Sequence, residues 1–224
     1  MQTAGFFMMA MAANLSAQNG QLITATQSQS ASGQAQLTIQ NNTDQPIGAF
    51  VYTWAASGVT PIKGFRFYEP ALYLAERPIA PRAALALRVG PPRAPVSIQF
   101  RAAVFADGSA FGDPVWVARI IHRRQLAVAA ADDMLKLLND DRSNPPASVG
   151  DIAAQIESYK AAHISASTDQ DVHDAAAYFI TWLNHNLKVQ EPTLGNVPSI
   201  IQRNIVLVAD VRTKLAASLA SGGH

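Results

Sequence analysis

Two clusters of polar residues have types and spacings that could take part in chemistry. The first is a basic patch within 119–124, where two arginines stand one helical turn apart. Such a patch can bind a phosphate, an anionic polymer or lipid headgroups. We expect surface or interdomain salt bridges in preference to such binding, because no nucleic-acid module accompanies the patch and the acidic pair Asp132 and Asp133 follows closely. The basic patch consists of Arg119, His122, Arg123 and Arg124.

The second cluster is 169–174, with the sequence DQDVHD. Its three carboxylates and one imidazole are ligands that suit a hard cation or a zinc-like ion. It does not fit a calcium loop, because the sixth position is not glycine and the twelfth, counted from Asp169, is Ile180 in place of glutamate. We expect instead that Asp169 and Asp171 lie in the first turn of a helix, where the helix dipole favours acidic side chains. The sequence therefore assigns no metal ligand here.

Local signatures of common enzymes are absent from the sequence. It contains no G-x-S-x-G elbow, no G-x-x-x-x-G-K-[ST] phosphate loop, no G-x-G-x-x-G and no H-E-x-x-H. The paired acids 132–133 and 140–141 are adjacent on a predicted helix, so we expect them to be solvated and not to flank a substrate as in glycoside hydrolysis. No catalytic residue, cofactor-binding residue or cofactor is assigned, although a triad of distant residues is compatible with the sequence.

The composition excludes several classes of protein. The chain has 224 residues, 49% of them hydrophobic, and no cysteine. It is long enough for one large or two small domains. A disulfide framework, a thiolate metal site and a cysteine nucleophile are excluded. The formal net charge of +1 gives no whole-chain attraction to nucleic acid or to an acidic membrane, so we predict no nucleic-acid partner.

The first 43 residues carry no charged side chain. The apolar run 5–15 is much shorter than the ~20 residues that span a bilayer, so no transmembrane segment is predicted. A small-residue pattern at 15–17 follows it, and we interpret 1–17 as a signal peptide, although a basic n-region is missing. The protein is then secreted or periplasmic, or cytoplasmic if this run is a buried N-terminal element. Residues 18–33 are interpreted as a flexible polar lead-in with room for one edge strand.

Residues 34–112 show the two-residue period of β-strands. We pair 96–104 with 84–89 as a hairpin, and expect further strands at 37–40, 47–54, 64–68 and 71–74. Short strands at roughly ten-residue spacing between Pro and Gly turns predict an antiparallel β-sandwich that is immunoglobulin-like in a loose sense, since it lacks a cysteine pair. The aromatic residues expected in its core, with an exposed recognition patch as the alternative, are Phe65, Phe67, Tyr68 and Tyr73.

Residues 113–220 show the 3.6-residue period of helices. Asp113 as N-cap and Pro114 at the first position predict a helix over 114–139, which at roughly 39 Å would project beyond the sandwich. Ser148, Thr168 and Pro198 are predicted to begin three more helices. The expected fold class is α+β, with an antiparallel bundle of three to four helices after the sandwich and a tail at 221–224. The apolar stripe expected to face inward on the first helix is Val117, Ile121, Val128, Leu135 and Leu138, widened by Trp116 and Ile120.

Two segments of the chain carry a resemblance to other proteins. The stretches LTIQNNTDQPIGAFVYTW, from Leu37, and VSIQFRAAVFADGSAFGDPVWVARII, from Val96, resemble uncharacterised bacterial exported proteins in which a small immunoglobulin-like domain precedes helices. The resemblance covers residues 37–124, and its most specific part runs from FADGS at 105–109 to GDP at 112–114. It implies the fold and export, and it carries no catalytic residue.

Two functional hypotheses follow. The first is a non-enzymatic exported protein whose surfaces bind a protein partner, a surface polymer of the envelope or another copy of itself. The second is an enzyme or small-molecule binder with its site at the junction between sandwich and helices, where a cleft often forms between domains. The residues named for the second are His122, Arg123, Arg124 and the cluster 169–174. If these residues lay far apart and exposed in the structure, the second hypothesis would have no named residues to support it.

Overall fold

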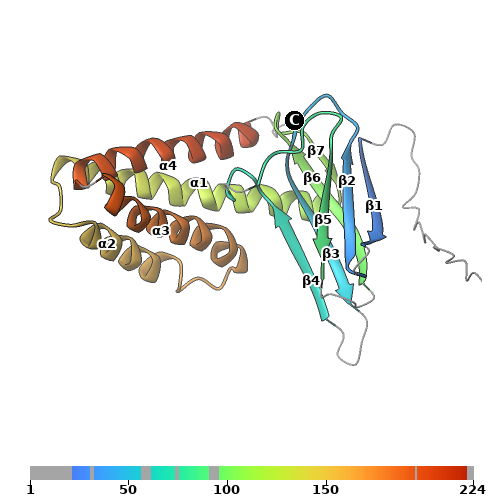
Figure 1. The fold of residues 1–224 in the computed structure, drawn as a ribbon, viewed down its shortest axis with the longest axis horizontal. Helices are drawn as coiled ribbons and strands as arrows, with labels where there is room; N and C mark the ends of the chain where they lie inside the picture. The colour runs from blue at the N-terminus through green and yellow to red at the C-terminus, as the bar shows by residue number, and fades with distance from the viewer. Residues whose placement is uncertain are drawn as a thin grey trace, which may run out of the picture.

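The computed structural model describes residues 22–30, 33–56, 62–73, 76–90, 96–194 and 196–220. In this part of the chain, two antiparallel sheets form the N-terminal half and four α-helices the C-terminal half, so the fold class is α+β as predicted (Figure 1). We call 22–112 the β-half and 113–220 the helical half. The predicted signal peptide 1–17 and the tail 221–224 lie outside the described residues.

The β-half consists of two sheets with the strand orders β1-β2-β5 and β4-β3-β6-β7. Alternation of apolar and polar residues produces these strands, and in β2 buried residues alternate strictly with half-buried ones. The strands are β1 (Ile23–Gln29), β2 (Ala35–Asn41), β3 (Ile47–Ala56), β4 (Ile62–Tyr68), β5 (Ala84–Val89), β6 (Val96–Phe105) and β7 (Ala110–Gly112).

One apolar core lies between the two sheets. Leu37 and Ile39 of β2 contribute to it from one side, and Phe50 and Tyr68 contribute from the other. The rings of Phe50 and Tyr68 stack with their centroids 4.6 Å apart. The inward side chains of each strand therefore hold the two sheets face to face.

The predicted lead-in 18–33 contains a strand. β1 pairs over its whole length with β2 and lies at the edge of its sheet. Its polar side chains suit this position, because an edge strand keeps one side open to solvent. Gln27 also reaches the other sheet, where its carboxamide oxygen accepts a hydrogen bond of 2.9 Å from the amide of Ile98.

Two predictions for the β-half are wrong. The hairpin of β5 with β6 does not form, because the chain crosses between the sheets after Val89, so that β5 pairs with β2 and β6 pairs with β3 and β7. The strand predicted at 71–74 is a turn in its described part, where the amides of Leu72 and Tyr73 both donate to the carbonyl of Glu69. This turn carries Leu72 out of the β-half and into the core of the helical half.

The helical half contains four α-helices in the described residues, and a single turn of π-helix, η1, leads into the third. Asp113 caps the first helix as predicted, since its carboxylate accepts from the amide of Val115 at 3.0 Å. None of these helices is both long and apolar enough to cross a membrane. The elements are α1 (Pro114–Ser143), α2 (Val149–His163), η1 (Val172–Ala176), α3 (Ala177–Leu194) and α4 (Val197–Ala220).

The predicted start of the second helix is confirmed, and that of the third is wrong. Ser148 forms a capping box with Asp151 at the start of α2, as its sequence predicts. Thr168 does not mark the start of the next helical segment. There the carboxylate of Asp169 accepts from the amide of Asp171 at 2.8 Å, so the cap is displaced by one residue.

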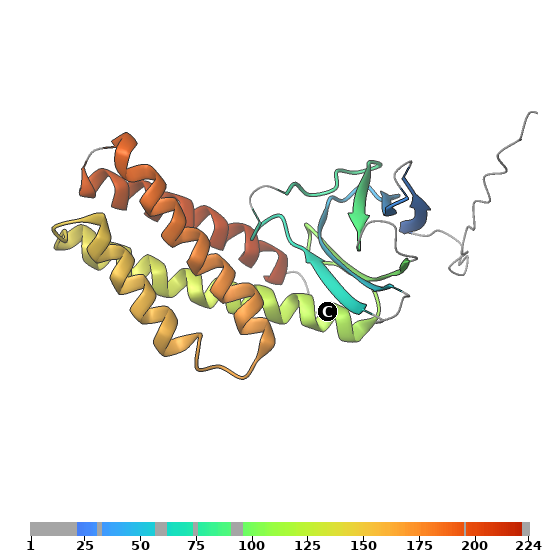
Figure 2. The same ribbon diagram turned by 60° about the horizontal axis from the view of Figure 1, so that its bottom comes forward.

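Helix α1 belongs to both halves of the molecule (Figures 1 and 2). Its 30 residues give it a length of about 45 Å. Its first turns cover the outer face of the four-stranded sheet, where Ile120 packs with Val51 and Val104. Farther along, it lies beside α4, and Met134 and Leu138 are buried in the core of the helical half. The second and third turns of α1, which carry the basic patch, therefore stand at the junction.

The buried face of α1 matches the predicted stripe at only two positions. Of the seven residues expected to face inward, Ile120 and Leu138 are fully buried, and the others are half-buried. The face in the core instead contains small residues and Met134, which allows α4 to pack closely. Large apolar side chains define the predicted stripe, whereas the positions buried in the core are filled by small residues, Ala127, Ala130 and Ala131.

Candidate functional site

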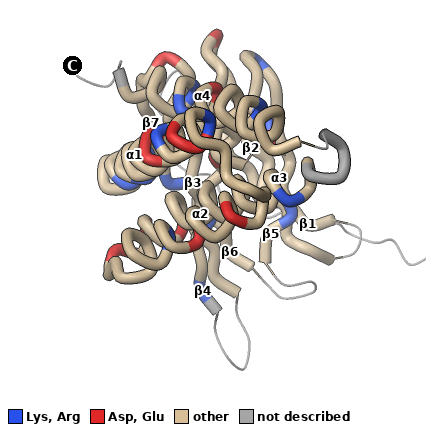
Figure 3. The backbone as a smooth tube through the Cα atoms, turned by 90° about the vertical axis from the view of Figure 1, so that its left-hand side faces the viewer, with Lys and Arg blue, Asp and Glu red and all other residues tan. Residues whose placement is uncertain are grey.

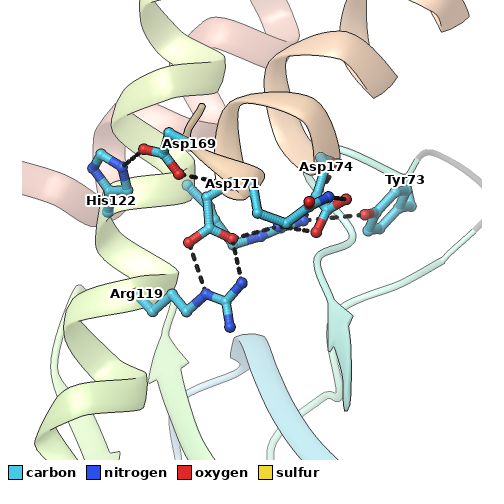
Figure 4. Close-up of polar contacts among 8 residues, drawn as sticks. Tyr73, Arg119, His122, Asp169, Asp171 and Asp174 are labelled. Atoms are coloured by element: carbon cyan, nitrogen blue, oxygen red, sulfur yellow. Dashed lines mark hydrogen bonds and ion pairs between the residues drawn. The ribbon is translucent and has the colours of Figure 1, made fainter. Parts of the chain in front are cut away.

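At the junction, the basic residues of α1 meet acidic residues from the start of η1. Arg119 donates two hydrogen bonds to the carboxylate of Asp171, at 2.7 and 2.9 Å (Figure 4). Arg123 donates to the same carboxylate at 3.1 Å and lies 3.6 Å from a carboxylate oxygen of Asp174. Two guanidinium groups therefore share one buried carboxylate, an arrangement that fixes the orientation of all three side chains.

Arg124 faces the β-half instead. It donates two hydrogen bonds, both of 3.0 Å, to the carboxylate of Glu69, which directly follows β4. The exposed fractions of the two side chains are 2% and 7%. Burial raises the pKa of Glu69, and the attraction of Arg124 opposes that rise. The pair links the third turn of α1 to the end of β4.

His122 and Asp169 form a third contact at the solvent-exposed side of the junction. The imidazole Nε2 lies 2.8 Å from a carboxylate oxygen of Asp169 (Figure 4). Hydrogen bonding to His122 and to the amide of Asp171 lowers the pKa of Asp169. Among the described residues, no group of three or more histidine or acidic side chains is arranged to hold a metal ion.

All four residues of the basic patch are thus paired with carboxylates. Arg123 and Arg124 are buried, while Arg119 is half-buried and His122 exposed. Binding of an added anion by this patch stays a prediction. The residues named for the junction hypothesis do lie together, because the segment 169–174 meets α1 at this point.

A pocket of about 540 Å³ lies beside these ion pairs, between the two halves. Strand β4 and the turn after it form one wall, and Asp174 of η1 and Tyr178 of α3 form another. Tyr73 and Tyr178 meet edge to face with their ring centroids 4.4 Å apart. Phe65 and Tyr178 are each 40% exposed. The lining residues are Phe65, Arg66, Phe67, Tyr73, Glu76, Arg123, Asp174 and Tyr178.

The charges that line this junction pocket are balanced. Arg66 pairs with Glu76 at 3.0 Å, and Arg123 pairs with Asp171 and Asp174. Burial raises the pKa of Glu76, and Arg66 opposes the rise. Burial also raises the pKa of Tyr73, so its hydroxyl is uncharged near neutral pH. The pocket therefore offers aromatic rings, a neutral hydroxyl and paired charges.

The aromatic residues of the β-half were predicted to lie in its core, and this is correct only for Tyr68. Phe67 lies on the opposite face of β4, under α1, in contact with Trp116. Phe65 shares that face, and Tyr73 is carried to the junction by the turn. A two-residue period places 65 and 67 on one face and 68 on the other, so the strand itself could have predicted the split.

A larger groove, of about 940 Å³, lies between α3 and α4. Its lining includes Trp182 and the 61%-exposed Val206, and none of the residues with predicted chemistry. Seen from this end of the molecule, both acidic and basic residues occur on the helices (Figure 3). Neither the lining nor the charge points to a particular ligand for the groove.

Comparison with known proteins assigns no family. The chain matches no family model, no curated protein and no solved structure. The resemblance to exported proteins with an immunoglobulin-like domain thus stays a prediction.

We expect Asp171→Asn to lower the free energy of unfolding by about 2–3 kcal/mol. Asparagine keeps the shape of the side chain but removes the charge that Arg119 and Arg123 share, and Arg123 is 4% exposed. Urea unfolding followed by circular dichroism measures the loss. Asp210→Asn is the control, because Asp210 pairs with Lys214 on the solvent-exposed surface of α4, where loss of an ion pair costs about 0.5 kcal/mol or less. Equal losses would contradict a stabilising role for the shared carboxylate.

Proposed function

We propose that this protein is a non-enzymatic binding protein that holds a neutral, sugar-sized unit of a surface polymer in the junction pocket. One observation carries the proposal: exposed aromatic rings and charge-balanced polar groups converge on a pocket between the two halves. Ligand pockets typically combine a largely apolar and aromatic lining with a few placed polar groups.

The ring faces and the charge balance favour a neutral polar ligand. Phe65 and Tyr178 offer exposed aromatic surface on which the C–H face of a sugar ring can pack. The hydroxyl of Tyr73 and the polar atoms of the ion pairs can form hydrogen bonds with sugar hydroxyls. A charged ligand would have to compete with the Arg66–Glu76 pair or with the carboxylates at Arg123, whereas a neutral one leaves them intact.

The same contacts favour binding over catalysis. A general acid or base must be free to exchange a proton with the substrate. Glu76 is held by Arg66 and also accepts from the amide of Glu69 at 3.2 Å. Tyr73, whose pKa is raised, would be a poor base near neutral pH. The polar groups of the pocket are therefore arranged to orient a ligand and not to react with it.

Finer features of the fold belong to the same proposal. We propose that the β-half is an immunoglobulin-like sandwich, because its sheets have the orders A-B-E and C′-C-F-G when β1 to β7 are lettered A, B, C, C′, E, F and G. We propose that the four helices form an antiparallel bundle, which the lengthwise packing of α1 with α4 and of α2 with α3 supports (Figure 2). Export, expected from 1–17, would give the protein access to an envelope polymer.

The proposal is tested by calorimetric titration of the full chain with two neutral hexasaccharides, one of glucose and one of N-acetylglucosamine. We expect at least one to bind, and Tyr178→Ala to weaken binding at least tenfold because it removes an exposed ring from the pocket. Tyr178→Phe keeps the ring and should keep most of the affinity.

Val206→Ser is the matched control for the Tyr178 variant. It changes an exposed residue of the groove between α3 and α4 and should leave the affinity unchanged. Lack of binding to both saccharides, or binding that Tyr178→Ala does not weaken, would contradict the proposal. Binding lost on Val206→Ser would move the site to the groove.

A further inference from the structure

A second recess, also of about 540 Å³, lies on the outer face of the four-stranded sheet, beside the first turn of α1. Small side chains of β3 and β6 line it, among them Ala55 and its paired residue Ser97. Phe65 of β4 and Trp116 of α1 also line it, with their ring centroids 5.7 Å apart. Because small residues stand next to these large rings, the sheet surface is hollowed at this point.

Two cations line this recess, and neither has a carboxylate partner within the described part of the chain. Lys63 is exposed on β4. Arg101 donates to the side-chain oxygen of Gln99 at 3.2 Å, and its guanidinium lies 5.9 Å from the ring centroid of Trp116. The Nε of Arg101 is buried without a hydrogen-bond partner, which costs free energy. None of the described residues that line the recess is acidic, in contrast to the balanced charges of the junction pocket.

We infer that this recess binds a sugar-sized ring that carries a carboxylate or a phosphate. The anionic group lies between Lys63 and Arg101, whose charge-assisted hydrogen bonds it receives, and the ring packs on the aromatic side chains. This site goes beyond the proposed function, because it shares only Phe65 with the junction pocket and takes a ligand of different charge.

The geometry favours such a small ligand over a single-stranded nucleic acid. Successive bases stack on successive aromatic rings, whereas the planes of Phe65 and Trp116 are inclined by 58° and form a corner. Two cations can meet only one or two phosphates, and the net charge of +1 adds no long-range attraction.

The test is a titration of the ¹⁵N-labelled full chain followed by NMR at the indole N–H of Trp116. The probes are glucuronate, glucose 6-phosphate and the neutral glucose. We expect at least one anionic probe to bind at least tenfold more tightly than glucose, and its identity distinguishes a carboxylate from a phosphate ligand. Equal binding of all three probes, or binding of none, overturns the inference.

Three variants locate the binding. Lys63→Gln removes one exposed cation and Ser97→Phe fills the recess without changing its charge, so each should weaken binding of the anionic probe at least tenfold. Arg88→Gln is the matched control, because it removes an exposed cation from β5 of the other sheet. A loss with Arg88→Gln equal to that with Lys63→Gln would mean that only overall charge is sensed, and it would overturn the site.

One further variant tests whether the anionic probe binds in the junction pocket and not in the recess. Tyr178→Ala lies outside the recess and should leave binding of the anionic probe unchanged. A loss of at least tenfold with Tyr178→Ala would place the anionic ligand in the junction pocket and overturn the separate site. The variants therefore test the two proposed binding sites separately, and a result that contradicts one site does not contradict the other.

Discussion

Replacing Glu69 by glutamine is expected to lower the free energy of unfolding by about 3–5 kcal/mol. Glutamine preserves the size of the side chain but leaves the guanidinium of Arg124, 2% exposed, without its opposite charge. The Nη1 of Arg124 already has no hydrogen-bond partner, so the carboxylate of Glu69 is the acceptor on which this cation depends. Urea unfolding at pH 7, followed by tryptophan fluorescence, measures the loss.

The double variant Glu69→Leu with Arg124→Met separates the effect of charge from that of packing. Both charges are removed together, and apolar residues of similar volume are often as stabilising as a buried ion pair. We therefore expect the double variant to recover most of the lost stability. If it is no more stable than Glu69→Gln, the loss arises from packing around the pair and our electrostatic explanation is wrong. Stability unchanged in Glu69→Gln would mean that α1 does not depend on this contact with β4.

Elements were predictable where neighbouring residues in the sequence determine them. The strands β2, β3 and β6 follow from alternation, and the caps Asp113 and Ser148 act on amides two and three residues away. These signals depend only on local geometry. They would be present in the isolated segments, and the sequence alone therefore indicates them.

Strand partners were not predictable in the same way. β5 and β6 are consecutive strands, and consecutive strands usually pair, but here they belong to different sheets. The apolar residues at 71–73 resemble a strand, yet Leu72 is buried among helices. In both cases the outcome depends on which distant surface buries the side chains, and no local pattern records that choice.

The candidate site was predictable in part. The spacing of Arg119 and Arg123 indicates one basic helix face, and surface or interdomain salt bridges were the preferred interpretation of it. The sequence does not indicate that Asp171, about fifty residues later, lies between them, because that contact depends on how the helical segments pack. The second hypothesis expected a cleft at this junction, but the meeting of Phe65 with Tyr178 in it was not predicted, since β4 and α3 supply these rings from opposite halves.

Gly112→Ala is expected to lower the free energy of unfolding by about 3–5 kcal/mol. Gly112 ends β7 with φ of +107°, a conformation that L-residues rarely adopt. A Cβ at this position would overlap the carbonyl oxygen of Arg101 and lie 2.8 Å from the Cα of Ala102. Both atoms belong to the backbone of β6, so they cannot rotate away as a side chain would. Thermal and urea unfolding measure the loss.

Gly33→Ala is the control, because Gly33 also has positive φ, +76°, but a Cβ there would have nothing within 4 Å. We expect it to cost only about 1 kcal/mol, from backbone strain alone. The difference between the two variants measures the close approach of β7 to β6. Gly112 directly precedes the Asp113 cap, so a displaced β7 would also displace the start of α1 and the ring of Trp116. Equal losses in the two variants would show that the backbone between β7 and α1 can shift to accommodate a side chain. In that case α1 is positioned by its ion pairs and not by this turn.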